Sequence, residues 1–369
     1  MKYILLTLTG FLFAVLQSSC NDLNSHKNNQ LHPKFDADQE NINSLMHNDI
    51  EDQEIINLKN RFQKLSLLDE IDEGYIFGNI TDIEFDNNFN LYLLDLDQVK
   101  VFKVWDSEID TLGSKGRGPG EMLFPWSLEI DSLNNIYVSD LQRGITNIKS
   151  NEEEVDILTR SSYSDLKKTD NGFFLRKEMI MSPNPEGKIN TIDFYDVLED
   201  TITYSFGNAY KNRNQLAVQN YSSGLMEYLK SNNIILTINI HSPYLYAYKS
   251  GEEIWKRKIE NFISFEMTST DEPLSIKYHT KFTEKENKYD EIKTLEQISD
   301  KYVLIQILRA SFDDNSNKRG EIKLKSYILD SELGQAYRID DMHQVVAIKD
   351  NRLVIHEKTD NSNLKLYSF

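Results

Sequence analysis

The feature that most constrains the fold of this chain is an internal repeat. The segments "IEFDNNFNLYLLD" (83–95) and "LEIDSLNNIYVSD" (128–140) align without a gap at a spacing of 45 residues. The alignment pairs identical residues at Asp86 and Asp131, Asn90 and Asn135, Tyr92 and Tyr137, and Asp95 and Asp140. A period of about 40 to 50 residues is typical of one propeller blade, which has four antiparallel strands. The repeat therefore predicts an all-β fold built from such blades.

The strands of the first unit can be placed from its hydrophobic pattern. Residues 80–85 and 99–105 alternate between apolar and polar, 91–94 are apolar on both faces, and 108–112 form a short fourth segment. The "DNNFN" segment between the first two strands is a predicted tight turn, because Asp and Asn tolerate left-handed backbone. Asp86, Asn88 and Asn90 also have the first three spacings of a calcium loop, but Leu91 replaces its glycine, so we predict a turn and no metal site.

A glycine-rich stretch, "TLGSKGRGPGEMLFPW" (111–126), follows the fourth segment of the first unit. Glycine and proline suit a sharp crossing from one blade to the next. A phosphate-binding P-loop would require Gly-x-x-x-x-Gly-Lys-Ser/Thr running into a helix, whereas a strand follows here. The alternative that remains is an anion held by exposed amides near Lys115 and Arg117.

Residues 113–140 resemble an NHL repeat, which has a glycine-rich crossing with Glu and Pro, a strand, an Asp and Asn turn, and a Tyr-Val-x-Asp strand. Met122 stands where these repeats usually have Phe. With its N-terminus, the chain resembles the six-bladed β-propeller lipoproteins of Bacteroidota with NHL-like or TolB-like repeats. The resemblance implies six four-stranded antiparallel blades. The C-terminal segment 343–369 supplies only three strands, so we expect an N-terminal strand within 54–71 to close the last blade.

The N-terminus, "MKYILLTLTGFLFAVLQSSC", has a basic Lys2, an apolar run over 3–16 and then small polar residues. This order predicts a secretory signal peptide over 1–19, and the run is too short for a membrane-spanning helix. Cys20, the only cysteine, follows two serines and resembles the lipid-attachment residue of a lipobox, although Gln17 replaces the usual leucine. A cleaved signal with an incidental cysteine is the alternative.

The resemblance to lipoproteins implies a domain order and a location. Residues 20–50, polar and rich in asparagine, are expected to be the lipidated cysteine and a flexible tether, and 51–369 the propeller. We expect an exported monomer, lipid-anchored to the outer membrane and either periplasmic or at the cell surface. Contact with the membrane is expected through the N-terminal lipid only.

Charge and motifs restrict the function. A net charge of −18 argues against nucleic acid, whose phosphates require a basic surface. The sequence has no Gly-x-Ser-x-Gly or His-Glu-x-x-His motif. We therefore predict a non-catalytic ligand-binding or protein-assembly module without a cofactor, whose partner is an unknown protein or carbohydrate. The alternative is a carbohydrate hydrolase or lyase with its site at the channel mouth.

Propellers commonly bind ligands on the face that carries the loops between second and third strands and the crossings between blades. The residues expected on this face are candidates for ligand binding, because arginines with aromatic side chains suit an anionic or polyhydroxylated ligand. They are Asp95, Asp97, Arg117, Trp126, Asp140, Arg143, Arg176, His241, Tyr244 and Arg309.

Overall fold

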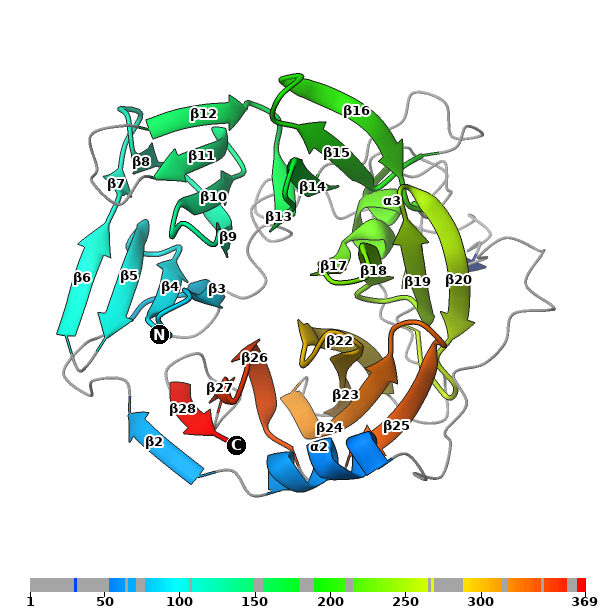
Figure 1. Ribbon diagram of the computed structural model, residues 1–369. Helices are drawn as coiled ribbons and strands as arrows, with labels where there is room; N and C mark the ends of the chain where they lie inside the picture. Colours follow the sequence, from blue (N-terminus) through cyan, green and yellow to red (C-terminus); the bar gives the residue numbers. More distant parts are fainter. Residues whose placement is uncertain are drawn as a thin grey trace, which may run out of the picture.

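The computed structural model of the chain describes residues 30–31, 53–63, 66–70, 77–105, 108–148, 155–178, 189–209, 215–264, 267–268, 288–313, 318–339, 342–356 and 364–369. The predicted signal peptide, Cys20 and most of the predicted tether lie outside these residues. The described strands form a ring of blades around a common centre, with one inner strand from each blade beside it (Figure 1). We call the region between these inner strands the channel. The prediction of an all-β propeller is confirmed.

Six four-stranded antiparallel sheets make the blades. The first three blades, each from its inner to its outer strand, are β3 (Ile80–Phe85), β4 (Leu91–Asp95), β5 (Lys100–Trp105) and β6 (Glu108–Leu112); β9 (Pro125–Ile130), β10 (Ile136–Asp140), β11 (Gly144–Ile148) and β12 (Val155–Thr159); and β13 (Tyr163–Lys168), β14 (Gly172–Lys177), β15 (Ile192–Asp196) and β16 (Thr201–Phe206).

The other three blades are β17 (Gly224–Leu229), β18 (Ile234–Asn239), β19 (Tyr244–Lys249) and β20 (Glu252–Lys258); β22 (Lys288–Gln297), β23 (Tyr302–Asp313), β24 (Lys318–Asp330) and β25 (Gln335–Ile339); and β26 (Gln344–Lys349), β27 (Arg352–His356), β28 (Leu364–Ser368) and β2 (Ser66–Glu70). The two-stranded pairs are β7 (Ser114–Lys115) with β8 (Glu121–Met122), and β1 (Gln30–Leu31) with β21 (Met267–Thr268).

The last blade is closed as the sequence predicts, by a strand from the N-terminal side. β2 pairs antiparallel with β28, so the fourth strand of blade six comes from the start of the propeller. The preceding residues form helix α2 (Gln53–Gln63), which the sequence pattern does not separate from the closing strand. Its buried Ile55, Leu58 and Phe62 pack against blades five and six, so the helix covers their junction.

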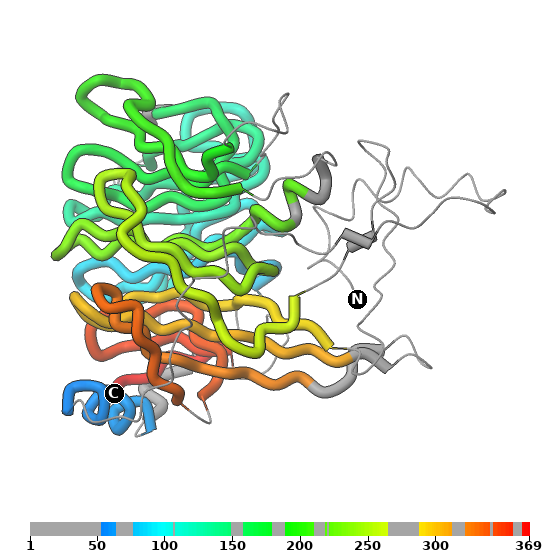
Figure 2. The backbone as a smooth tube through the Cα atoms, turned by 90° about the vertical axis from the view of Figure 1, so that its right-hand side faces the viewer, coloured from blue at the N-terminus to red at the C-terminus, as the bar shows by residue number. Residues whose placement is uncertain are grey.

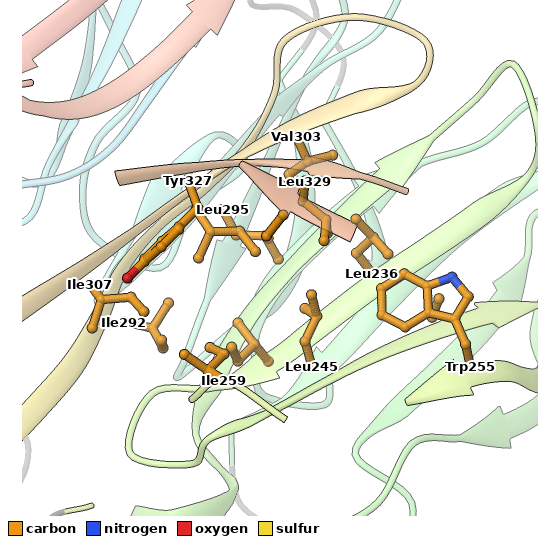
Figure 3. Close-up of a cluster of buried hydrophobic side chains, with 14 of the residues drawn as sticks. Leu236, Leu245, Trp255, Ile259, Ile292, Leu295, Val303, Ile307, Tyr327 and Leu329 are labelled. Carbon is orange, nitrogen blue, oxygen red and sulfur yellow. The ribbon is translucent and has the colours of Figure 1, made fainter. Parts of the chain in front are cut away.

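Hydrophobic clusters join each pair of neighbouring blades. Six such clusters occur in the part of the chain that the structure describes. Figure 3 shows the one between blades four and five, in which Leu236, Leu245 and Leu329 are fully buried. Burial of this apolar surface contributes roughly 25 cal/mol per Å², so the ring is held together by contacts between blades rather than by one central core.

The repeated turns are built by aspartate side chains. Asp86 Oδ1 accepts hydrogen bonds from the amides of Asn88 and Asn90 at 2.8 and 2.9 Å, and its Oδ2 accepts one from the Asn90 side chain. Asp131 makes the same bonds with Leu133 and Asn135. These carboxylates therefore build the turns, as predicted.

The two faces of the ring carry different loops. One face, called here the crossing face, carries the loops between second and third strands and the crossings between blades. Helix α3 (Gln215–Ser222), which lies in the crossing from blade three to blade four, and the far end of the β23–β24 hairpin project on the same side in Figure 2. The predicted binding residues belong to this face or to strand ends beneath it.

Candidate functional site

Two of the predicted aspartates hold loops of the crossing face together. Asp140 Oδ2 accepts hydrogen bonds from the amides of Leu123 and Phe124 at 2.5 and 3.0 Å, and its Oδ1 accepts those of Gln142 and Arg143 at 2.8 and 3.1 Å. Asp95 serves the equivalent loop of blade one. It is fully buried and accepts hydrogen bonds from the amides of Gly78 and Gln98. Backbone amides of the loops thus engage both oxygens of each carboxylate.

The glycine-rich crossing is also satisfied from within the chain. The amide of Gly118 donates to the Glu121 carboxylate, and Arg143 Nη1 donates to the carbonyls of Gly118, at 2.8 Å, and Glu121. A side chain at Gly116 would collide with the same carboxylate. Glu121 therefore occupies the place that an external anion would need. The predicted ligand residue Arg143 acts as a brace for this crossing.

Arg176, another predicted ligand residue, is fully buried between blades three and four. Its guanidinium donates to the carbonyl of Ser222 and to Asn239 Oδ1, both at 2.7 Å, and to the Thr237 hydroxyl. Burial lowers the pKa of this guanidinium to about 10, although nearby Asp165 favours the charged form. Arg176 thus ties the end of α3 to blade four rather than facing the solvent.

Arg309 and Tyr244 are likewise parts of the fold. Arg309 forms a two-point ion pair with Asp290, with Nε–Oδ1 and Nη2–Oδ2 distances of 2.7 and 2.6 Å, and also donates to the Asn261 carbonyl. Tyr244 is buried, and the Lys256 ammonium lies 4.6 Å from its ring centroid. Two-point pairing fixes the guanidinium plane, so this pair holds the blade-four crossing to the long hairpin.

The predicted residues that remain accessible lie mostly in blades one and two. Asp97 and Arg117 are exposed, and Trp126 is partly exposed at the start of β9. The Trp126 ring stacks on that of Phe124, with centroids 6.3 Å apart and planes inclined by 9°. Because Asp140 binds the Phe124 amide, the backbone beneath this aromatic pair is fixed.

His241, in the loop between β18 and β19, is partly buried and lies near two charged residues of β22. Burial lowers the pKa of His241, while Glu291 raises it and Lys293 lowers it. Glu291 and Lys293 form an ion pair at 2.6 Å. The structure therefore brings His241 to a charged pair on the inner strand of blade five, where it is held largely neutral.

Besides the residues of the crossing face, a cluster of charged side chains lies in the channel, and the sequence did not predict it. At equivalent places near the far end of five inner strands lie the residues we call the channel ring: Glu84, Glu129, Lys167, Glu227 and Glu296. Lys167 Nζ lies 3.7 Å from Glu84 and 3.5 Å from Glu227, so it reaches from blade three to blades one and four. The ring is therefore a single electrostatic unit across the channel.

A second layer of polar residues lies two positions earlier on three of these strands, nearer the crossing face. Asp82 Oδ2 accepts hydrogen bonds from the Ser127 hydroxyl at 2.9 Å and the Leu128 amide at 2.7 Å. Ser127 Oγ is also 3.4 Å from Asp165, whose other oxygen accepts the Met226 amide. A chain of polar contacts thus joins blades one, two, three and four.

Burial perturbs the acidity of all these carboxyls. It raises the pKa of Asp165 to about 7 and that of Glu84 to about 8, with Lys167 opposing both shifts. Burial also raises the pKa values of Asp82 and Glu227, and those of Glu129 and Glu296 rise well above their ordinary values. For Lys167, burial lowers the pKa, but Glu227 and Glu84 outweigh burial, so the net shift is upward.

A signal for the ring was present in the sequence. Glu84 and Glu129 coincide in the repeat, 45 residues apart, yet strand alternation made both look like solvent-facing positions. In the structure, alternate apolar residues such as Ile83 and Leu128 pack against the preceding blade. The polar residues between them meet in the channel because the inner strands close into a ring.

Two properties of the described residues concern membranes and metal ions. None of the helices there is both long and apolar enough to span a membrane. Within the same residues, no group of three or more His, Cys, Asp or Glu side chains is placed to hold a metal ion.

No protein-family model matches the chain, and no curated protein does either. Among solved structures, it is similar to a Bacteroides fragilis protein described as exported, with 14% identity, a TM-score of 0.55, and coverage of 89% of this chain and 98% of that one. A member of the DUF4221 family from Bacteroides vulgatus has 11% identity, a TM-score of 0.52, and coverage of 83% and 97%.

A gluconolactonase from Xanthomonas campestris has 12% identity and a TM-score of 0.51, with coverage of 89% of this chain and 95% of that one. At such identities the likeness extends to the fold and not to the chemistry of a site. The comparisons therefore identify the chain as a β-propeller whose structural neighbours include a Bacteroides protein described as exported.

Proposed function

We propose that the protein is an exported, lipid-anchored binding module that recognises a carbohydrate at its crossing face without catalysing a reaction on it. The lipid would be attached at Cys20, and the tether would hold the propeller near the membrane surface. We place the lipid anchor in the outer membrane, with the propeller on the periplasmic side or at the cell surface. It concerns a rigid protein that presents preformed loops to a ligand.

The observation that carries this proposal is the stacked pair of Phe124 and Trp126. Both rings are partly exposed, and they stack nearly parallel to each other. Exposed Arg117 belongs to the same crossing. A partly exposed aromatic pair with a charged donor in the same crossing suits a sugar ring, which has an apolar face and hydrogen-bonding hydroxyl groups at its edge.

The internal bonding of the crossing supports binding rather than catalysis. Asp140, Arg143 and Glu121 are all occupied in fixing the loop, so they are not available as a nucleophile or a base. Fixed loops lower the entropy lost when a ligand binds. The geometry thus favours recognition by a prearranged surface.

A thermal-shift screen of the protein against oligosaccharides, peptidoglycan fragments and acidic sugars tests the proposal. A specific ligand at 100 times its Kd stabilises the folded protein by about 2.7 kcal/mol, which raises the melting temperature. We expect Trp126→Ala to abolish the shift. Trp105→Ala is the matched control, because Trp105 is also partly exposed but ends β5 on the opposite face.

Two outcomes would count against carbohydrate binding at the aromatic pair. One is the absence of a shift with every sugar in the panel, which would favour a protein partner to be sought by crosslinking. The other is a shift that Trp126→Ala and Trp105→Ala leave equally intact, which would place the ligand elsewhere.

The second candidate is a carbohydrate-active enzyme with its site in the channel. It is favoured by the channel carboxyls, because a glycosidase needs one carboxyl that stays protonated near neutral pH, and the pKa of Glu84 is raised to about 8. Product formation from any ligand of the screen, lost in Glu84→Gln, would support this candidate. Binding without product would support the binding module.

A further inference from the structure

The channel contains more acid than base. Six carboxyl groups from five inner strands lie there: Asp82, Glu84, Glu129, Asp165, Glu227 and Glu296. One ammonium, that of Lys167, acts electrostatically on every one of them. Few charged groups lie at the two ends of the channel, so the cations that could balance these carboxylates can be counted.

At the crossing-face end, Arg176 favours the ionised form of Asp165. At the other end, Lys349 lies near Glu84 and donates to the Phe85 carbonyl and to Asn87 Oδ1, both at 3.2 Å. The pair formed by Glu291 and Lys293 is neutral as a whole. Lys168, beside Glu129, is a further cation. Even with Lys168 and both end cations counted, six carboxylates would exceed four cations.

Access to water is limited within the ring. The side chains of Glu227, Lys167 and Glu84 retain 10%, 16% and 29% of their exposure. Like charges that share a partly buried site cannot all ionise, because burial and mutual repulsion both favour the neutral acid. Lys167 lies closer to Glu227, at 3.5 Å, than to Glu84, at 3.7 Å, and one ammonium balances one carboxylate. Glu84 and the other unbalanced carboxyls are therefore left to hold protons.

We propose that the channel ring is a proton-held joint, in which bound protons keep the six blades closed at neutral pH and their loss at alkaline pH weakens the contacts between blades. Closing the ring brings carboxyls of blades one, two, four and five around a lysine of blade three. In the unfolded chain the same groups are far apart in the sequence and fully hydrated. The folded protein therefore takes up protons that the unfolded chain releases.

The sign of the pH dependence follows from this uptake. The stabilising contribution is complete below the unfolded-state pKa values, near 4, and is lost as pH rises through the folded values, which are about 7 for Asp165 and about 8 for Glu84. Each extra proton held by the folded state changes the folding equilibrium constant tenfold per pH unit. Stability should thus fall as pH rises from about 4 to about 8, most steeply below pH 7, where both acids are protonated in the folded protein and ionised in the unfolded chain.

The test is a set of urea unfolding curves of the full chain at pH 5.5, 7 and 8.5. We expect the folding constant of the wild type to fall at least tenfold per pH unit over the lower half of this range, from pH 5.5 to 7. In the variant Glu84→Gln/Glu129→Gln/Glu296→Gln, which imitates three protonated acids, the fall should be much smaller. At pH 8.5 this variant should be more stable than the wild type.

The matched control is Glu199→Gln/Glu252→Gln/Glu332→Gln, which removes the same charge at exposed positions and should keep the pH dependence of the wild type. A wild type whose stability is constant or rises from pH 5.5 to 8.5 would overturn the proposal. If the ring variant does not fold, carbon-13 NMR of the wild-type carboxyl groups decides. Carboxyls that titrate above pH 6 support the joint, and their absence refutes it.

Discussion

The sharpest prediction about the crossing face concerns the stability lost when Asp140 is replaced. Its carboxylate accepts four backbone amides, two from the loop before β9 and two from its own turn. Replacing it by alanine leaves all four amides without this acceptor. A hydrogen bond to a charged group contributes about 1.5 to 3 kcal/mol, and water can replace part of it in a half-buried loop. At about 1 kcal/mol for each bond, we expect Asp140→Ala to cost about 4 kcal/mol.

Asp140→Asn should lose only part of this stabilisation, because asparagine keeps one of the two acceptor oxygens. The amide oxygen can replace one carboxylate oxygen, but the amide NH₂ group donates and cannot accept from Leu123 or Phe124. Asparagine should therefore lose roughly half as much stability as alanine, about 2 kcal/mol, when it keeps the turn contacts to Gln142 and Arg143. Urea unfolding followed by circular dichroism measures both values.

The critical result is that Asp140→Ala loses more stability than Asp140→Asn. A loss below about 1 kcal/mol in Asp140→Ala, or equal losses in both variants, would refute the bonding scheme. Asp131→Ala is the control, because Asp131 builds a turn on the opposite face. It should lower stability without weakening any ligand binding at Trp126, whereas Asp140→Ala should weaken both.

The remaining predictions concern the blade contacts and the anchor. Leu236→Ala removes a fully buried side chain between blades four and five, so it should cost about 2 to 5 kcal/mol in urea unfolding, whereas Leu133→Ala, at a position 79% exposed, should change stability by less than about 0.5 kcal/mol. Similar effects of both would contradict the blade packing. Cys20→Ala should move the protein from the membrane fraction to the soluble fraction, and a protein that stays in the membrane would disprove the lipid anchor.

Much of the fold was predictable because local patterns repeat along the chain. The 45-residue repeat placed the strands of blade one to within a residue or two, and Asp86 and Asp131 marked turns that the structure confirms. The missing strand of the last blade pointed to the N-terminal side, where β2 lies. Helix α2 was missed because its apolar residues merge with those of β2 in one short apolar pattern.

The candidate site was less predictable, because it depends on which side chains are already bonded to other parts of the protein. Arg176 and Arg309 were predicted as ligand residues on the crossing face, yet Arg176 is enclosed and Arg309 is paired with Asp290. No local pattern tells a bonded arginine from a free one. The channel ring was missed for a related reason: Lys167 and Glu84 are separated by 83 positions and meet only when six blades close.

The central claim, that the aromatic pair on the crossing face binds a carbohydrate, is tested most directly by fluorescence of Trp126 alone. The chain has three tryptophans, so Trp105→Phe/Trp255→Phe leaves Trp126 as the single reporter. Titration with the oligosaccharides, peptidoglycan fragments and acidic sugars of the screen should change its emission saturably for at least one of them. Emission that none of them changes, while any binding persists in Trp126→Ala, would contradict the account.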